Sequence, residues 1–496
     1  MSRAEAGELS PATTVRSHRG SVRTAVVILL PAAALSVALH VWAVMSPAAP
    51  VNADEAMTGL QAYNVLQGHF SPIVEGNDYG GALESYLLAP LLLGTGGTAA
   101  IKLVPILLSF GAGLALAWAC APLLGRRVAL VVCGVSWVSS GAAVVLWSRN
   151  YLGYASGAIA MIVALGFAVR LMTRPTPSLS FGAGLAGGLA LWGHPIYGVV
   201  AMLGCLPVLA VRRHWTVLLS VVGGALLGVC PWLVYLSRHG VPRVPTNDLV
   251  TTYPDRLRIL VTELLPSGFG LRSPTGEWLE PFGLTLTIAV VLIVGALAGL
   301  VLLPRWAGGA ALPFTVAGLC AVPVLALFQA LAFSTDGRYA GAFMPTLLVG
   351  LFGWTRVRRA VAQPPLGLAA VIPVLWGVLA CVPSMHAAAG WSWQNPNVDV
   401  ERAVVALQQR DITAVRGSYW VVYLLDYYAE GRLDAWPDIT QRLPDDVARA
   451  KATPPSHLAF AYEAGAVEAG VVTLPGPRSD YTLVPAGRWE IWVPAQ

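Results

Sequence analysis

The sequence predicts an all-α, polytopic membrane protein with about eleven transmembrane helices and a small C-terminal α/β domain. Three observations lead to this fold class. Hydrophobic residues fill 56% of the 496 positions and charged residues only 11%, whereas soluble globular proteins carry roughly 25% charge. Long apolar runs recur between residues 25 and 386. The composition then changes, because 13 of the 26 acidic residues lie after residue 386.

Apolar runs of about 17 residues or more mark the expected spans, since a helix of that length crosses the hydrocarbon core of a bilayer. The predicted spans are 25–45, 99–121, 127–147, 151–170, 179–193, 195–211, 215–236, 281–303, 309–333, 340–355 and 366–386. The fifth and sixth runs are short, and His194-Pro195 between them also fits a kink within one longer helix. A second property of the chain must decide between the two arrangements.

The arginines decide this question, because basic residues concentrate in cytoplasmic loops. With eleven spans, every arginine cluster lies on the side of the N-terminal tail. Merging the fifth and sixth spans places Arg212-Arg213 outside and inverts the orientation of every later span. The clusters are Arg16/Arg19/Arg23, Arg126-Arg127, Arg170/Arg174, Arg212-Arg213, Arg305 and Arg356/Arg358/Arg359.

The first apolar run is long for the apolar core of a signal peptide, so we expect it to be an uncleaved membrane anchor.

This topology divides the chain into a cytoplasmic tail (1–24), a transmembrane domain (25–386) and an extracytoplasmic domain (387–496) of a protein in the cytoplasmic membrane. The first outer loop (46–98) and a later outer loop (237–280) are long, whereas the cytoplasmic loops are short and basic. Nearly all acidic groups therefore face the outer side.

The C-terminal domain is predicted from short segments separated by Pro/Gly turns. A polar helix is expected at Val398–Gln409, and strands at Ala414–Leu424 and His457–Tyr462. In the outer loop 237–280, Arg256–Leu265 is an amphipathic stretch. It fits a structural surface helix, and the loop also fits a cover for a lipid groove or a contact with an acceptor.

The remaining composition excludes two classes of protein. The formal charge of +5 comes from arginines at helix ends and not from a basic stripe, so no nucleic-acid partner is expected. The six cysteines lie in or beside apolar runs and form no CxxC pair. They indicate buried apolar side chains and not a disulfide framework or a metal site. Lysine is rare, because only Lys102 and Lys451 are present.

The first outer loop begins with a pair of acids, Asp54-Glu55, directly after the first span. The residues that follow, Met57–Gly68, have apolar positions on adjacent helical faces and predict a short amphipathic helix on the membrane surface. Asp54 is then the expected N-cap and Glu55 a first-turn residue. The pair therefore has a purely structural explanation, because acids cap helices and complement their dipoles.

Further along the same loop, Asp78 and Tyr79 precede Glu84, which leads into the apolar segment Ser85–Leu93. This segment is too short to span and is expected to lie at or re-enter the interface, covered by protein. A carboxylate at Glu84 lies where water is scarce. Its structural role is a pair with an arginine of another outer turn, and acids close to the membrane are also functional candidates.

Three outer turns supply cations and aromatic groups. Arg149-Asn150-Tyr151 joins the third and fourth spans, His194 lies between the fifth and sixth, and Arg338-Tyr339 heads the tenth. Each alone fits an interfacial anchor of Arg and Tyr. Because arginine is disfavoured outside, two arginines and a histidine beside several carboxylates indicate a site for an anionic group and a proton acceptor.

The loop pattern Ala-Asp54-Glu55-Ala, with Tyr79-Gly80-Gly81 and Glu84, resembles the first loop of the GT-C class of glycosyltransferases. The Arg149-Asn150-Tyr151 and Arg338-Tyr339 turns resemble that class as well. Protein O-mannosyltransferases and the lipid A aminoarabinose transferase are the most similar groups. The likeness covers the layout of most of the first 385 residues, although its specific motif is essentially the Asp-Glu loop.

The resemblance implies a sugar transfer from a polyprenyl-phosphate carrier to an acceptor hydroxyl of a protein, lipid or glycan on the outer face of the membrane. The class's first-loop aspartate corresponds to Asp54, which would be the general base, with Glu55 beside it. Arg149, Arg338, Tyr339 and His194 are the candidates to bind the donor phosphate. Asp78, Tyr79, Glu84 and Asn150 are candidates to bind substrate or shape the site. A single displacement of this kind inverts the anomeric carbon.

The chain departs from the class in two respects. Some members have another acidic residue near the outer end of an early helix, where this chain has Arg149 and Asn150. No DxD sequence, expected of metal-dependent members, occurs in an outer loop. A divalent metal is compatible with the residues but not indicated, and we expect no cofactor.

Two other functions remain open. A transporter or lipid flippase predicts charged groups near the bilayer midplane, broken helices and often internal repeats. This sequence has charge-free span centres and no visible repeat. A receptor or assembly factor would act through the outer domain and would not need acids and arginines that converge at the membrane surface.

Overall fold

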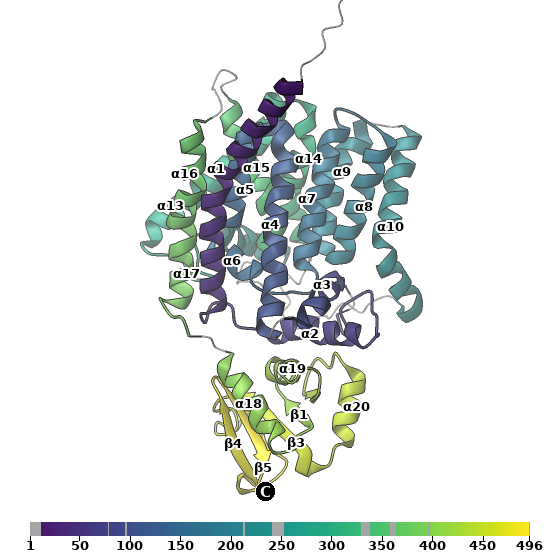
Figure 1. Cartoon of the computed structure of the whole chain (residues 1–496), viewed down its shortest axis with the longest axis vertical. Coiled ribbons are helices and arrows are strands. Elements are labelled where there is room, and N and C mark those ends of the chain that lie inside the picture. Colours follow the sequence, from purple (N-terminus) through teal and green to yellow (C-terminus); the bar gives the residue numbers. More distant parts are fainter. Residues whose placement is uncertain are drawn as a thin grey trace, which may run out of the picture.

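The computed structural model consists of a helical bundle with a small α/β domain at one end (Figure 1). It describes residues 11–495, except for 78, 95–96, 212–213, 241–251, 329–337, 358–363 and 395–396, with side chains from residue 22 onward. Asp78, Arg212-Arg213 and most of the turn before Arg338 therefore lie outside the described residues.

Among the described residues up to residue 390, all regular structure is helical, apart from isolated bridges. The helices of this region are α1 (Pro11–Val44), α2 (Ala53–Leu66), α3 (Leu83–Leu92), α4 (Gly97–Leu124), α5 (Arg126–Trp137), α6 (Gly141–Trp147), α7 (Tyr154–Leu171), α8 (Pro177–Gly193), α9 (Pro195–Val211), α10 (Trp215–His239), α11 (Tyr253–Ile259), η1 (Leu260–Leu264), α12 (Leu265–Gly268), α13 (Phe282–Ala307), η2 (Gly309–Ala311), α14 (Leu312–Leu325), η4 (Arg338–Ala342), α15 (Met344–Gly353), η5 (Trp354–Arg356), α16 (Leu366–Trp376), η6 (Gly377–Cys381) and α17 (Val382–Ala389). Each of the eleven predicted spans contains one or more of these helices.

Six of the described helices are long and apolar enough to cross a membrane, or seven if the pair α5 and α6, bent by 78°, forms one span. The other helices within predicted spans are short, with 17 residues in α8 and α9, 14 in α14 and 10 in α15. The chain thus has the helices of a multi-pass membrane protein, whereas the number eleven remains a prediction.

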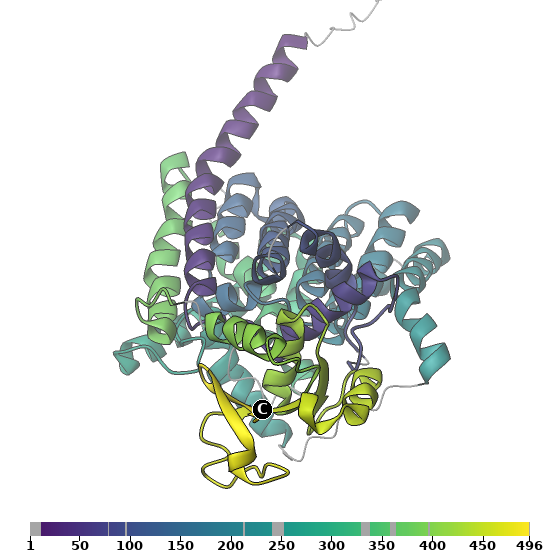
Figure 2. The same ribbon diagram turned by 60° about the horizontal axis from the view of Figure 1, so that its bottom comes forward.

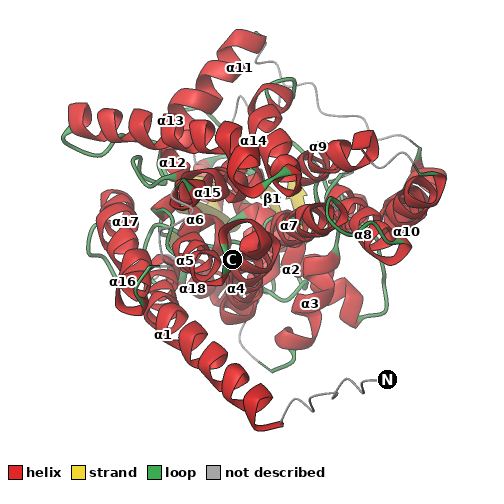
Figure 3. Cartoon of the chain, turned by 90° about the horizontal axis from the view of Figure 1, so that it is seen from above, coloured by secondary structure: helices red, strands yellow, loops and turns green. Residues whose placement is uncertain are grey.

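Close helix packing in the bundle depends on glycines, which let backbones approach within a membrane. A Cβ atom added to Gly184 of α8 would lie 1.9 Å from the carbonyl oxygen of Val221 in α10. One added to Gly228 of α10 would lie 2.4 Å from that of Leu185 in α8. The two helices therefore pack along a seam that no larger residue fits. At the edge of the bundle, α1 lies beside α16 (Figure 3).

The C-terminal domain contains a five-stranded sheet in the order β2-β1-β3-β5-β4. Strand β1 pairs in parallel with β2 and β3, whereas β5 is antiparallel to β3 and β4. Its elements are α18 (Val398–Gln408), β1 (Ala414–Gly417), α19 (Tyr419–Tyr428), β2 (Asp434–Pro437), α20 (Pro444–Ala452), η7 (Pro455–His457), β3 (Leu458–Glu463), η8 (Arg478–Asp480), β4 (Tyr481–Ala486) and β5 (Trp489–Pro494). The mixed sheet agrees with the predicted α/β class.

Within this domain, the helix expected at Val398–Gln409 and the strand expected at His457–Tyr462 are observed. The strand expected at Ala414–Leu424 is wrong after Gly417, because the chain turns at Ser418 into α19. Helix α19 is rich in aromatic and β-branched residues, which favour strands. It is nevertheless a helix because nearly its whole length is buried against α2 and the sheet.

Helix α2 lies between the bundle and the domain (Figures 1 and 2). Its first ten residues are buried, so the predicted amphipathic helix on the membrane surface is wrong in its exposure. The α19 side chain Tyr427 packs on α2 so closely that a Cβ atom on Gly59 would lie 2.2 Å from its ring, and its hydroxyl donates a 2.6 Å hydrogen bond to the Gly97 carbonyl. This contact fixes the domain against the start of α4.

Candidate functional site

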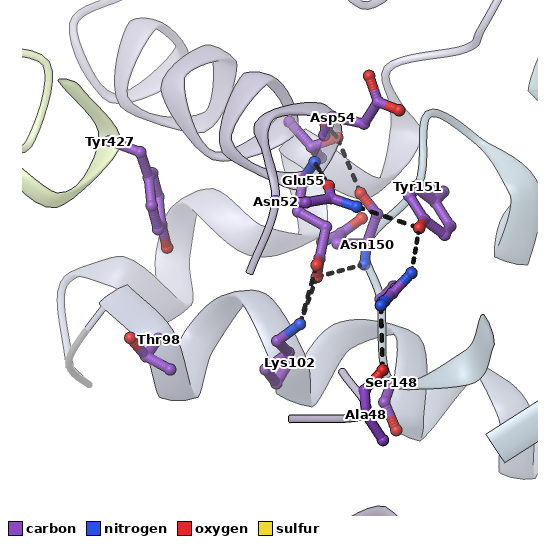
Figure 4. Close-up of polar contacts among 12 residues, drawn as sticks. Ala48, Asn52, Asp54, Glu55, Thr98, Lys102, Ser148, Asn150, Tyr151 and Tyr427 are labelled. Atoms are coloured by element: carbon purple, nitrogen blue, oxygen red, sulfur yellow. Dashed lines mark hydrogen bonds and ion pairs between the residues drawn. The ribbon is translucent and has the colours of Figure 1, made fainter. Parts of the chain in front are cut away.

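The beginning of α2 carries the acid pair that the sequence singled out. The N-cap is Asn52 and not Asp54, because the Asn52 side-chain oxygen accepts a 3.0 Å hydrogen bond from the Glu55 amide. Asn and Asp are equally good N-caps, so the prediction missed by two positions. As a result both acids lie in the first helical turn and their side chains leave the helix in different directions (Figure 4).

Glu55 points toward the bundle. Both of its carboxylate oxygens accept hydrogen bonds from the Lys102 ammonium of α4, at 2.8 and 2.9 Å (Figure 4). The backbone N–H of Asn150 donates a third hydrogen bond to the same carboxylate, at 3.0 Å. The Glu55 and Lys102 side chains are 0% and 3% exposed. A buried pair with these hydrogen bonds is neutral as a unit and fixes α2 to α4.

Asp54 points the other way, toward the C-terminal domain. Its Oδ1 atom accepts a 2.7 Å hydrogen bond from the Tyr419 hydroxyl of α19 and lies 3.3 Å from Nη2 of Arg442. Burial, together with the nearby Asp54 charge, raises the pKa of Tyr419, so this hydroxyl stays protonated and remains a donor. Within the described part of the chain, Oδ2 of Asp54 accepts no hydrogen bond.

The two predicted phosphate-binding arginines lie close to the same aromatic ring. The Arg149 and Arg338 guanidinium carbons lie 5.8 and 5.1 Å from the centre of the Tyr151 ring. Arg149 also donates to the Tyr151 hydroxyl at 2.7 Å and to the Ala48 carbonyl at 3.0 Å, and the Asn52 amide donates to the same hydroxyl. Tyr151 therefore connects both cations to the residue that caps α2.

An aromatic cluster extends from these arginines toward Asp54. His194 is buried, with its ring 5.5 Å from Tyr79 and 4.4 Å from Tyr154, and Tyr154 lies 6.0 Å from Tyr339. Burial and the proximity of Tyr339 raise the pKa of Tyr79 to about 12, whereas Arg442 and Arg338 act in the opposite direction. The Tyr79 hydroxyl is thus close enough to feel the charges of both Arg442 and Arg338.

Glu84 has a different partner from the one expected. Its carboxylate pairs with no described arginine, and it accepts hydrogen bonds from the backbone amides of Gly153 (3.1 Å) and Ser156 (2.7 Å) at the start of α7. Those amides have no partner inside their own helix, so the acid caps α7 from α3. Burial raises the pKa of Glu84 to about 7, and the two amides oppose this shift.

Most predicted site residues converge on one end of the bundle. The Asp54 and Arg338 charges both act on the Tyr79 hydroxyl. Ring contacts continue from Tyr79 through His194 and Tyr154 to Tyr339, and Arg149 lies with Arg338 beside Tyr151. Asn150 is fully buried, and neither amide atom of its side chain has a hydrogen-bond partner among the described residues. Glu55 and Glu84 are turned away into structural contacts, and Asp78 lies outside the described residues.

Three residues of the site were missed by the sequence analysis. Lys102 was noted only for its rarity, although a lysine inside an apolar run is itself a signal, because an isolated charge there is costly. Tyr419 and Arg442 lie in the C-terminal domain, more than 360 positions after Asp54. No local pattern links them to the first outer loop.

A narrow, mostly apolar cavity of about 50 Å³ lies inside the bundle behind this cluster. It is lined by the break between α5 and α6 and by parts of α4, α7, α12, η4 and α15, among them Ser140, Leu146, Gly268, Gly341 and Leu348. Among the described residues, no group of three or more His, Cys, Asp or Glu side chains is arranged to hold a metal ion.

No family model and no curated protein matches the sequence. Solved structures do match. ArnT from Cupriavidus metallidurans in the apo state superposes with a TM-score of 0.65 at 12% identity, covering 97% of this chain and 100% of that one. The chain has the fold of ArnT. The same enzyme bound to undecaprenyl phosphate gives a TM-score of 0.61 at 12% identity, with 94% and 99% covered.

An oligosaccharyltransferase from Archaeoglobus fulgidus is more distant, with a TM-score of 0.48 at 12% identity over 88% of this chain and 70% of that one. The likeness to ArnT extends over the bundle and the C-terminal domain together. The resemblance to GT-C glycosyltransferases that the sequence indicated is therefore confirmed at the level of the fold.

Proposed function

We propose that the protein is a glycosyltransferase that moves a sugar from a polyprenyl-phosphate donor to an acceptor hydroxyl, with inversion at the anomeric carbon. The observation that carries this proposal is the position of Asp54. One of its oxygens is held by Tyr419 and Arg442, while the other has no hydrogen-bond partner among the described residues. A carboxylate held in this way is oriented but still able to accept a proton.

In the proposed reaction, the acceptor oxygen attacks the anomeric carbon as its proton passes to Oδ2 of Asp54. The bond between that carbon and the phosphate oxygen breaks, and its electron pair stays on the leaving polyprenyl phosphate. One displacement on the face opposite the leaving group inverts the configuration. Glu55 takes no part in proton transfer, because its carboxylate is committed to Lys102.

The leaving phosphate gains negative charge during the reaction. Cations are needed to stabilise that charge, and no general acid is needed to protonate the leaving oxygen. Arg149 and Arg338, both beside Tyr151, are the proposed binding groups, since guanidinium groups form strong charge-assisted hydrogen bonds with phosphate. Burial of the His194 ring within an aromatic cluster makes it a wall of the site in this proposal and not a phosphate ligand.

The donor's isoprenoid chain must lie in an apolar environment. The cavity at the break between α5 and α6 has such a lining and can take part of a chain beside the arginines. ArnT from Cupriavidus metallidurans, which has this fold, was solved with bound undecaprenyl phosphate. That neighbour supports the choice of a lipid-phosphate carrier for this chain.

The proposed topology has eleven spans, with the end of the bundle that carries the C-terminal domain on the outer side of the cytoplasmic membrane. The positive-inside rule supports this orientation, because the domain contacts Gly97 at the start of α4, whereas Arg126-Arg127 follow the other end of this 28-residue helix. Sugar nucleotides are absent outside, which fits a lipid-linked donor.

The test uses membranes that contain the full chain or an Asp54→Asn variant, each supplied with radiolabelled undecaprenyl-phosphate-linked sugars in a panel of mannose, glucose, galactose, arabinose and aminoarabinose. We expect transfer from one of these donors by the wild type, with an anomeric configuration in the product opposite to that in the donor. Retention of configuration would contradict the single displacement. Absence of donor consumption, combined with transport of the lipid or sugar in liposomes, would support a transporter or flippase.

A further inference from the structure

We propose that a second, polar cleft binds the acceptor, and that this acceptor is an uncharged glycan. The inference rests on the proposed function and adds the class of its second substrate. The cleft of about 660 Å³ lies where the end of α2 and the loop after it meet the end of α10 and the start of α20. Its volume lies in the range of small-molecule and oligosaccharide sites, which often form between domains.

The charges in the cleft cancel. Apart from the two histidines His69 and His239, its basic residues are Arg238 of α10 with Arg442 and Arg449 of the domain, and its acids are Glu75, Asp445 and Asp446, which gives three of each sign. Arg449 already pairs with Asp446 at 2.6 Å. A site for an anionic lipid or a phosphorylated acceptor would carry an excess of cations, so this cleft favours a neutral ligand.

Flat aromatic surfaces lie next to these polar groups. Phe70 is 71% exposed and its ring stacks on Tyr86 at 6.3 Å, which holds it in place at the edge of the cleft. On the opposite wall, Tyr235 stacks on His239 at 4.3 Å. Aromatic faces cover the apolar C–H face of a sugar ring, while charged and amide groups bond to its hydroxyls. The combination is suited to a polyhydroxylated molecule.

Arg442 connects the cleft to the proposed base. It lines the cleft, and its Nη2 atom contacts Asp54. Its Nε and Nη1 atoms are buried and have no hydrogen-bond partner among the described residues. Protein atoms enclose these two donors, so a ligand would contact the exposed groups of the cleft instead. A glycan in the cleft would lie beside the side chain that holds Asp54.

Gly76 fixes the position of Arg442. It has a φ of +67°, and a Cβ atom there would lie 2.4 Å from Cβ of Arg442. The first outer loop therefore packs directly against Arg442, the domain side chain that contacts both the cleft and Asp54.

The test measures binding of neutral oligosaccharides of mannose, glucose, galactose and arabinose to the purified full chain in detergent, by isothermal titration calorimetry. We expect one oligosaccharide class to bind with an affinity that hardly changes between low and high salt. Phe70→Ala should raise its Kd by about tenfold through loss of the stacking surface. Trp215→Ala, an exposed aromatic at the opposite end of α10, is the matched control and should leave the Kd unchanged.

Two results would overturn the inference. One is a lack of binding of every neutral oligosaccharide, together with transfer to an anionic glycolipid that salt suppresses. The other is oligosaccharide binding that Phe70→Ala leaves unchanged. Because the calorimetry needs no donor, its outcome is separate from the donor assay above. Donor consumption without oligosaccharide binding rejects the acceptor class alone. Oligosaccharide binding without donor consumption rejects the transferase and with it the acceptor role of the bound glycan, and leaves only a glycan-binding cleft.

Discussion

The two faces of α2 at its first turn provide two environments for the same chemical group. On the face toward the bundle, the Glu55 carboxylate is enclosed, hydrogen-bonded at both oxygens and neutralised by Lys102. On the face toward the domain, the Asp54 carboxylate is held at one oxygen by a hydroxyl and a guanidinium group. The residues are neighbours in sequence, yet only one of them retains an oxygen without a hydrogen bond in the described structure.

The two acids have different roles, because Glu55 holds the helix in place whereas Asp54 is the proposed base. The Glu55–Lys102 pair holds α2 against α4, and its members need each other because a single buried charge is unstable. Asp54 gains its orientation from the C-terminal domain. The domain is therefore part of the proposed active site and not an appendage of the membrane bundle.

The largest predicted effect is that of Asp54→Asn. Removal of a general base lowers turnover by about 10²- to 10⁴-fold, and the neutral amide can keep the contact with Tyr419, so the fold should persist. The measurement is the rate of sugar transfer in membranes alongside the thermal midpoint of the purified protein. The double variant Glu55→Gln with Lys102→Met is the matched control, because it removes the other acid without leaving a buried charge unpaired. A loss of turnover in this control as large as that of Asp54→Asn, at unchanged stability, would erase the distinction between the two acids.

Lys102→Met tests the other face of α2. It leaves the Glu55 charge buried without its cation, which costs about 3–5 kcal/mol, so we expect a much lower thermal midpoint in detergent. The double variant Lys102→Met with Glu55→Gln should recover most of this loss, because no charge remains buried. A single variant as stable as the wild type would show that the pair does not fasten α2.

Tyr419→Phe has a smaller predicted effect. It removes one hydrogen bond to the carboxylate, and bonds to charged groups contribute about 1.5–3 kcal/mol, so turnover should fall by about tenfold or more. The KM for the donor should stay the same, since Tyr419 lies in the domain and away from Arg149 and Arg338. Tyr428→Phe is a matched control, because its hydroxyl bonds to Thr98 and not to Asp54.

The smallest predicted effect concerns another buried carboxylate, Asp426 of α19, which accepts a backbone hydrogen bond from Leu433. Burial raises its pKa well above the ordinary value. Above about pH 3.9, the usual aspartate pKa, the unfolded chain loses this proton before the folded protein does. The free energy of unfolding therefore falls as pH rises toward the raised pKa.

Asp426→Asn should remove that decline and raise the stability of the protein at neutral pH by on the order of 1 kcal/mol. Denaturant melts across the pH range measure it, with the exposed Asp480→Asn as control. An Asn variant that is less stable than the wild type at neutral pH would mean that the charged form is the favoured one.

The sequence predicted the helical regions and the outer loop motifs because both are encoded locally. Each predicted apolar run contains one or more of the observed helices, and the acids and arginines of the outer loops and turns lie at the ends of these runs. The partner of Glu84 was not predictable in the same way. Backbone amides of Gly153 and Ser156 carry no residue-specific signal, so an arginine was the natural expectation.

The contribution of the domain was beyond sequence reasoning for a related cause. Tyr419 and Arg442 reach Asp54 only through the docking of α19 on α2, and such docking depends on shape over many residues. The same docking turned a β-prone segment into a helix. Lys102 differs, because a single lysine in an apolar run is a local sequence signal. A buried lysine of this kind needs an acidic partner, and the structure shows that this partner is Glu55.

A double-mutant cycle between Asp54 and Tyr419 tests most directly whether the domain acts through the proposed base. Sugar transfer is measured for the wild type, Asp54→Asn, Tyr419→Phe and the double variant, with thermal midpoints to confirm folding. If Tyr419 acts by orienting Asp54, Tyr419→Phe lowers transfer in the wild type by about tenfold or more and has no further effect in Asp54→Asn. Two independent, additive losses would contradict the account.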